Sequence, residues 1–428
     1  MDDLSGHMDW HWGHWTFDYS VSDSEGLSLF NGWYRGLEIF YKFSLPVIRV
    51  KYLHDAGWHT WAGKYSGAGP YSDQITRQID TGDDHGLQIW TGTTKYVDLS
   101  QFRSGGVRWL AMSVYARIGA YHIVQAWHLS ELGEILPRVW SKGLHRIMDH
   151  THHPYWRLDF DIDGAPHNIV SSVDDVNGEF SYYTEANDFK NSAIHRHWHV
   201  WNTQTGRGVF IYPGEHDGIA DAFSSIDVAV RRYHPEETNP WLSFGAWGEL
   251  GFLDGEFVGD SDIVFWYIAH LFHHAAEGDD AWHGAGPTIK VDLARLPPIP
   301  PPLLGLTITA STSPDQSGRG GDLMLNGRGF TPSERVQILV ENIPGDFYSA
   351  ADEVRANPDG TLNWIKRFDC TSNTPADRFQ RVIVSALDVR TENVATTTTR
   401  DSTIWVCPPL NPHIPPDDSD SQRNPSPV

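Results

Sequence analysis

The stretch His150-Thr151-His152, continued by Arg157-Leu158-Asp159-Phe160-Asp161-Ile162-Asp163-Gly164, decides the fold of this sequence. Apolar and acidic residues alternate along its second half, which is typical of a β-strand. The side chains of a strand return to the same face every second residue, so the imidazoles of His150 and His152 share one face. The stretch therefore predicts a β-protein in which half of a metal site is followed directly by a row of carboxylates.

The size and the charge of the chain limit what it can be. Its 428 residues are enough for two or three domains, and 40% hydrophobic residues with 19 tryptophans suffice for a large core. The 32 basic and 55 acidic residues give a net charge of −23. Such a charge disfavours nucleic acid and anionic membranes as partners and concentrates cationic ligands, amines among them. A charge that serves only solubility accounts for the same composition.

Two further observations concern the compartment. No apolar run has membrane-spanning length, and residues 1–8 lack a charged-then-apolar signal. We therefore expect a soluble protein, with a cytoplasmic location favoured and secretion left open. The two cysteines, Cys370 and Cys407, match no metal-binding pattern. They form either a bridge worth about 4 kcal/mol in an oxidising compartment or two free thiols.

Short segments rich in β-branched and aromatic residues predict that strands outnumber helices in the first two thirds of the chain. These segments are residues 37–43, 48–52, 110–115, 195–201 and 208–212. Residues 261–276 are dense enough in apolar side chains for a helix, but their β-branched and aromatic centre favours a strand.

A proline-rich run, residues 297–302, marks the main domain boundary, because such a run is a stiff spacer. Beyond it, tryptophan becomes rare, and threonine, serine and glycine become frequent. We expect a first all-β domain over residues 1–296, a linker over 297–303, an immunoglobulin-like β-sandwich over 304–407 and a disordered tail over 408–428.

The histidine pair and the run that follows it resemble the copper amine oxidases. In that family a His-x-His pair supplies two copper ligands, and R-L-D-x-x-x-D-G follows at the same spacing. The resemblance covers most of residues 15–295 and none of the immunoglobulin-like β-sandwich expected over residues 304–407. It implies a β-supersandwich catalytic domain and a homodimer.

The resemblance also assigns two residues to catalysis in the first part of the chain. Residues 40–52 look like the family's Y-R-x-S-L-x-E-M-V-V-P-Y strand pair. On that match, Tyr52 is the tyrosine whose hydroxyl holds the oxygen of the cofactor. Asp55 resembles the family's catalytic base, which would remove a proton from the substrate.

Tyr121 matches the tyrosine that family members oxidise to topaquinone within a T-x-x-N-Y-[DE] motif. The tyrosine is the one residue of the motif that is present here. Arg117, Ala120 and His122 replace the threonine, the asparagine and the acid. The asparagine of the family orients the quinone, so its replacement favours a function without this cofactor.

The resemblance carries over His150 and His152 as copper ligands and His273 as the third ligand. Three neutral imidazoles suit copper or zinc. A second, peripheral cation site, for which calcium is expected, is matched by Asp159, Asp161 and Asp262. Without a cation these three would be solvated turn residues.

Other histidines compete with these assignments, because the chain has 23 of them. His195, His197 and His199 alternate and would share one strand face. They match a structural strand of the family, R-x-W-x-V-x-N, which favours a structural role over a metal site.

Together the assigned residues imply the oxidative deamination of a primary amine to an aldehyde, with O2 reduced to H2O2. Copper, topaquinone formed from Tyr121 and structural calcium would be the cofactors. The partners would be a small amine, O2 and a second copy of the chain. Two other functions stay open. One is a copper-dependent oxidase that carries out a biosynthetic oxidation without a quinone, and the other is a non-catalytic metal-binding protein.

Overall fold

The computed structural model describes residues 4–22, 25–53, 67–73, 97–118, 121–142, 149–238, 250–274, 282–296, 305–314, 320–342, 348–369 and 382–397. Within these ranges the chain consists almost wholly of antiparallel β-strands, which confirms the expected all-β fold class. None of the helices in these ranges has the length and hydropathy that crossing a lipid bilayer requires.

The chain divides into two compact units. The first comprises Met1–Leu99 and Leu110–Pro297, and the second comprises Ser100–Trp109 and Pro298–Val428. The expected linker over residues 297–303 and the expected tail over 408–428 lie outside the described residues. Cys370 and Cys407 lie outside them as well. The division into a catalytic domain and an accessory domain stays a prediction.

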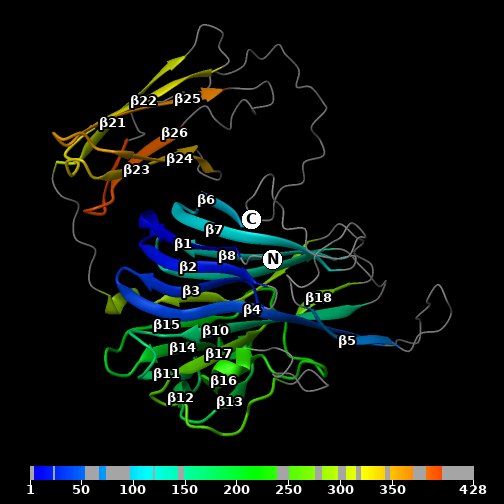
Figure 1. Cartoon of the computed structure of the whole chain (residues 1–428). Coiled ribbons are helices and arrows are strands. Elements are labelled where there is room, and N and C mark those ends of the chain that lie inside the picture. Colours follow the sequence, from blue (N-terminus) through cyan, green and yellow to red (C-terminus); the bar gives the residue numbers. More distant parts are fainter. Residues whose placement is uncertain are drawn as a thin grey trace, which may run out of the picture. The chain divides into compact units, whose positions relative to one another are not determined.

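The first unit contains a ten-stranded sheet in which β10 is central. Figure 1 shows its N-terminal strands (blue) beside β10 and β17 (green). In spatial order the strands are β1 (Leu4–Trp10), β2 (Trp15–Ser22), β3 (Gly26–Tyr34), β4 (Leu37–Leu53), β10 (His150–Phe160), β17 (Ile263–Ile268), β16 (Val228–Arg232) and β13 (Ala186–Asp188), with β5 (Gly67–Asp73) beside β4 and β18 (Leu271–His273) beside β10.

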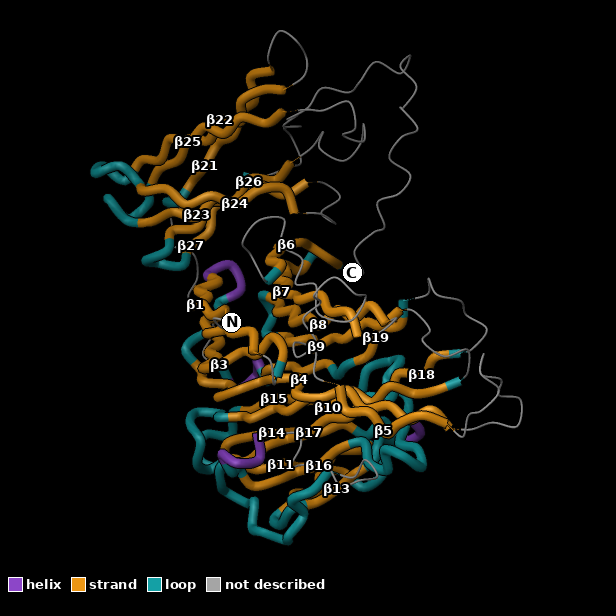
Figure 2. The backbone as a smooth tube through the Cα atoms, turned by 45° about the vertical axis from the view of Figure 1, so that its right-hand side comes forward, coloured by secondary structure: helices purple, strands orange, loops and turns teal. Residues whose placement is uncertain are grey.

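A second ten-stranded sheet packs against the first. Its order is β12 (Gly178–Tyr182), β11 (Asn168–Asp174), β14 (His197–Asn202), β15 (Gly208–Tyr212), β20 (Thr288–Val291), β9 (Glu134–Lys142), β8 (Tyr121–Ser130), β7 (Val107–Ile118) and β6 (Asp98–Ser104), with β19 (His283–Ala285) beside β9. Four 3₁₀ helices, η1 (His11–Gly13), η2 (Ser192–Ile194), η3 (Pro235–Thr238) and η4 (Leu293–Arg295), lie in connections between strands (Figure 2).

Aromatic side chains fill the space between the two sheets. Trp156 of β10 meets Trp127 of β8 edge to face, with ring centroids 5.1 Å apart, and both are fully buried. Phe43 of β4 packs on the same Trp127 at 6.0 Å. Because Trp156 and His152 are an even number of residues apart in β10, both side chains point toward the second sheet.

The strand expectations hold, with two changes of detail. Residues 261–276 contain β17 and β18, so the strand interpretation was right and the helix was wrong. Residues 40–52 lie in the single 17-residue strand β4 rather than in a strand pair. The strand expected over 195–201 begins at His197, because His195 is left-handed (φ 50°) and ends η2.

The second unit contains two small sheets. One has the order β21 (Thr307–Pro314), β22 (Gly320–Arg328) and β25 (Thr361–Asp369), and the other has β24 (Tyr348–Arg355), β23 (Arg335–Asn342), β26 (Val382–Asp388) and β27 (Asn393–Thr396). Buried residues of both sheets form one core, among them Leu325, Val340, Trp364 and Val384. This is the expected small β-sandwich.

A buried amide joins the two large sheets of the first unit. Gln125 of β8 is fully buried, and its side chain accepts a hydrogen bond from the Leu27 N–H and donates one to the Leu27 carbonyl, both at 2.9 Å. Trp127 Nε1 donates to the same carbonyl at 2.8 Å. Gly26 has φ +64°, and a Cβ there would lie 2.2 Å from Gln125 Oε1, so glycine is required at this contact.

We expect Gln125→Leu to lower the free energy of unfolding of the first unit by about 3 kcal/mol, because it leaves buried backbone groups of Leu27 without their partner. Urea unfolding followed by tryptophan fluorescence measures the change. Gln204→Leu, at an exposed position, is the matched control and should shift stability by less than about 0.5 kcal/mol. Equal stability of the two variants would contradict the prediction.

Candidate metal centre

Strand register brings together the three histidines that the sequence singled out. β18 pairs with the first residues of β10, so that His273 lies directly opposite His150. Directly opposed residues of an antiparallel pair share a face, and His152 follows on the same face two residues later. The ring centroids are 5.0 Å apart for His150 and His152, 5.2 Å for His150 and His273, and 4.8 Å for His152 and His273.

The three imidazoles are buried, with exposed fractions of 5% for His150, 4% for His152 and 2% for His273. Both ring nitrogens of His152 and Nε2 of His273 are buried without a hydrogen-bond partner. A buried polar atom of this kind is costly, and a metal ion is one way to satisfy it. This observation fits the donor set that a copper ion requires.

Burial also keeps these rings neutral. Burial and the neighbouring imidazoles hold the pKa of His152 well below its ordinary value. Burial first, and then His150 and His283, lower the pKa of His273 to about 3. A neutral imidazole has a lone pair to donate, so both residues are in the protonation state that a metal needs.

Tyr121 comes to the same place from the second sheet. It begins β8, is 5% exposed, and its hydroxyl lies 3.0 Å from His150 Nε2 in a hydrogen bond. Its ring centroid lies 4.7 Å from that of His152 and 6.1 Å from that of His273. The proposed cofactor precursor and the three proposed ligands thus form one buried cluster.

The described residues contain two groups of at least three potential ligands whose donor atoms all lie within 4.8 Å of one another, and both consist of carboxylates. The three histidines are not such a group, so their rings must turn toward a common point when they bind a metal. His150 is held by Tyr121, and release of that hydrogen bond is one such adjustment.

Two residues assigned to catalysis are not located by the structure. Tyr52 belongs to β4, but the position of its side chain is not described. Asp55 lies outside the described residues. Their roles stay predictions.

The carboxylates expected to bind a second cation do lie together. Asp159, Asp161 and Asp262 form one of the two carboxylate groups. The register of β10 and β17 places Phe160 opposite Ile263, which brings the flanking carboxylates to one end of the strand pair. One oxygen of each, Oδ1, is buried without a hydrogen-bond partner.

Electrostatics show why this carboxylate trio would favour a cation. Burial raises the pKa of Asp159 to about 6, against the pull of Arg157, whose guanidinium lies 3.1 Å away. Burial and then the neighbouring carboxylates raise the pKa of Asp161 to about 8 and that of Asp262 to about 7. A bound divalent cation would remove this repulsion.

The second carboxylate group, Glu185 with Asp254 and Glu256, is built differently. The Glu185 carboxylate accepts hydrogen bonds from the backbone N–H groups of Arg232 at 3.2 Å, Asp254 at 2.9 Å and Gly255 at 3.2 Å. Its oxygens are therefore already occupied, and the group ties a loop to β16.

The competing histidine triple does not converge. His195 pairs with Asp175 at 2.5 Å, outside the strand. His197 stacks on Tyr212, with ring centroids 4.7 Å apart, and His199 stacks on Phe210 at 4.3 Å. These contacts form an aromatic face on the second sheet, in agreement with the structural role that the sequence favoured.

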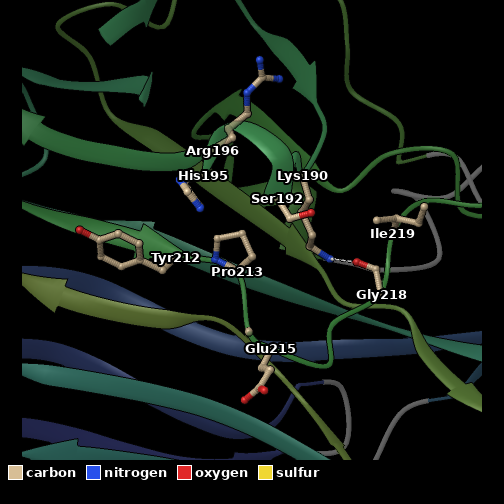
Figure 3. Close-up of a pocket in the computed structure, with 10 residues that line it drawn as sticks. Lys190, Ser192, His195, Arg196, Tyr212, Pro213, Glu215, Gly218 and Ile219 are labelled. Atoms are coloured by element: carbon tan, nitrogen blue, oxygen red, sulfur yellow. Dashed lines mark hydrogen bonds between the residues drawn. The ribbon is translucent and has the colours of Figure 1, made fainter. Parts of the chain in front are cut away.

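A pocket of about 510 Å³ lies at another part of the first unit (Figure 3). Its cationic side chains are engaged already. Lys190 donates to the Ile268 carbonyl at 2.8 Å, Arg196 to Asp188 at 3.0 Å, and His195 pairs with Asp175. The pocket therefore offers no free cation to a ligand through these three side chains.

Sequence reasoning missed one residue at the histidine cluster. The ring centroid of His283, from β19, lies 4.9 Å from that of His273. The signal available in the sequence was weak, because no second histidine stands two residues before or after His283.

Comparison with known proteins adds a likeness of fold. No protein-family model matches the sequence, and no curated protein matches it. Among solved structures, the copper-containing benzylamine oxidase from Hansenula polymorpha is similar with a TM-score of 0.50 and 14% identity, over 67% of this chain and 59% of that one. The Aspergillus nidulans amine oxidase has a TM-score of 0.47 and 16% identity, and the Pichia pastoris lysyl oxidase has 0.46 and 15%, each over 67% of this chain and 51% of the other.

This chain thus spans less than two thirds of the length of each of these proteins. At such low identity the likeness concerns the fold. Over 67% of its length, this chain has a fold similar to that of a copper-containing benzylamine oxidase.

Proposed function

We propose that this protein is a copper-dependent oxidoreductase that deaminates a primary amine to an aldehyde and reduces O2 to H2O2. The observation that carries the proposal is the contact of Tyr121 with three buried histidines, two of which have ring nitrogens without hydrogen-bond partners. The likeness of fold supports it, and the net charge of −23 would concentrate cationic amines.

In this proposal His150, His152 and His273 hold the copper as neutral imidazoles. When bound, copper supplies the redox chemistry that converts Tyr121 to topaquinone and passes electrons to O2. The buried position of Tyr121 excludes bulk water from its ring, and before the metal binds its hydrogen bond to His150 fixes the direction of the hydroxyl. Tyr52 would hold an oxygen of the cofactor, and Asp55 would accept the proton from the substrate carbon.

One observation favours a second candidate, a copper-dependent oxidase without the quinone. His122, which stands where the family has an acid, hydrogen-bonds the hydroxyl of Tyr115. Ala120, which stands where the family has the asparagine that orients the quinone, has no hydrogen-bonding side chain. A non-catalytic metal-binding protein is the third candidate. Calcium at the carboxylate trio, a homodimer and a cytoplasmic location are further parts of the proposal.

Copper binding tests what all three candidates share. We expect His152→Ala to weaken the binding of Cu(II) at least tenfold, because it removes a central donor. Titration against a competing chelator measures the affinity. His274→Ala is the control, since His274 is exposed and pairs with Asp149 at 3.2 Å. An unchanged affinity in His152→Ala would place the metal elsewhere and refute the proposed centre.

The quinone is tested separately. Copper-loaded, aerated protein should develop a coloured cofactor that reacts with phenylhydrazine, and the peptide that contains Tyr121 should change in mass. Tyr121→Phe should keep the copper and lose both signals, because its ring lacks the hydroxyl that directs the oxidation. An unmodified Tyr121 in fully copper-loaded wild-type protein would reject the quinone and leave the second candidate.

The carboxylate trio predicts a dependence of stability on pH and calcium. A carboxyl group whose pKa is raised on folding keeps its proton longer in the native state, so the metal-free protein should lose stability as pH rises from about 4 to about 8. Calcium should raise the Tm more at pH 8 than at pH 5. Asp161→Asn should remove most of the calcium response, and Asp254→Asn, from the other carboxylate group, should retain it. Equal responses in the two variants would exclude the site.

A further inference from the structure

His283 faces the interior between the two large sheets. It begins β19, which pairs with β9 so that His283 lies opposite Ser141. Directly opposed residues of an antiparallel pair share a face, and Ser141 is buried, 2% exposed, in the inward row of β9. His283 therefore points toward the first sheet, which carries the other histidines.

The spacing of His283 from His273 is compatible with two imidazoles bound to one metal ion. Its ring centroid is 4.9 Å from that of His273, at an interplanar angle of 61°. The three proposed ligands are separated from one another by 4.8 to 5.2 Å. With a metal–nitrogen distance of about 2.0 Å, two imidazoles on one ion have centroids roughly 4.5–5 Å apart.

Simple packing of His283 on His273 is the alternative, and the polar atoms argue against it. His273 Nε2 is buried without a hydrogen-bond partner, although the rings of His150 and His283 both lie next to the ring of His273. A cation shared by the imidazoles would satisfy Nε2 of His273.

We propose that His283 is a fourth nitrogen ligand of the copper, so that the centre is held by four imidazoles drawn from both sheets. The inference rests on the proposed function and deepens its metal site. β10 and β18 of the first sheet supply three ligands, and β19 of the second sheet supplies the fourth. The bound metal would then tie the two sheets together.

The test uses the full chain with Cu(II) alone as the probe. Pulsed electron paramagnetic resonance counts the coupled imidazoles, and chelator competition gives the affinity. We expect four coupled imidazoles in the wild type and three in His283→Ala, with an affinity at least tenfold weaker. His216→Ala, at an exposed position of the same unit, is the control and should match the wild type in both.

Added imidazole should restore a fourth coupled nitrogen in His283→Ala and leave the wild-type spectrum unchanged. If thermal unfolding shows that the metal-free alanine variant does not fold, His283→Gln keeps the size of the side chain and takes its place. Three coupled imidazoles in the wild type, with His152→Ala still deficient, would overturn this inference and leave the proposed function intact. Failure of the wild type to bind copper would overturn both.

Discussion

The pairing of β10 on both of its edges is the constraint on which the rest of this structure depends. β4 pairs with one edge, and β17 and then β18 pair with the other. The second sheet covers the inner face, and ten of the eleven residues of β10, on both faces, are buried. A shift of one residue in this register would turn His150 and His152 away from Tyr121, because the side chains of a strand alternate between its faces.

The same strand contributes residues to both candidate sites because it has two faces. Its inner face carries the histidines and Trp156, and its outer face carries Arg157 and Asp159. The outer face also holds His153, whose Nδ1 lies 2.8 Å from Nδ1 of His270. Polar groups in such a position are costly unless each has a partner. Their concentration along one buried strand is the reason to place the candidate site in this part of the sheet.

Much of the site follows from local sequence. Alternation placed His150 and His152 on one face, and the acidic residues after Arg157 indicated a row of carboxylates. The contact of His150 with His273 joins residues far apart in the chain, so the resemblance to a family was needed to suggest it. His283 was missed because it reaches the cluster through the pairing of β19 with β9, and a single histidine carries no sign of such a pairing.

By itself, the sequence determined the all-β class, the strand that carries the His150 and His152 pair and the direction of its side chains, because these depend on a two-residue period and on local preference. Only the tertiary structure decided that Tyr121 and His283 of one sheet meet His152 and His273 of the other. That meeting depends on strand register and on how two sheets face each other. Both arise from the burial of aromatic side chains such as Trp127 and Trp156 across the whole interface, and no short segment contains that information.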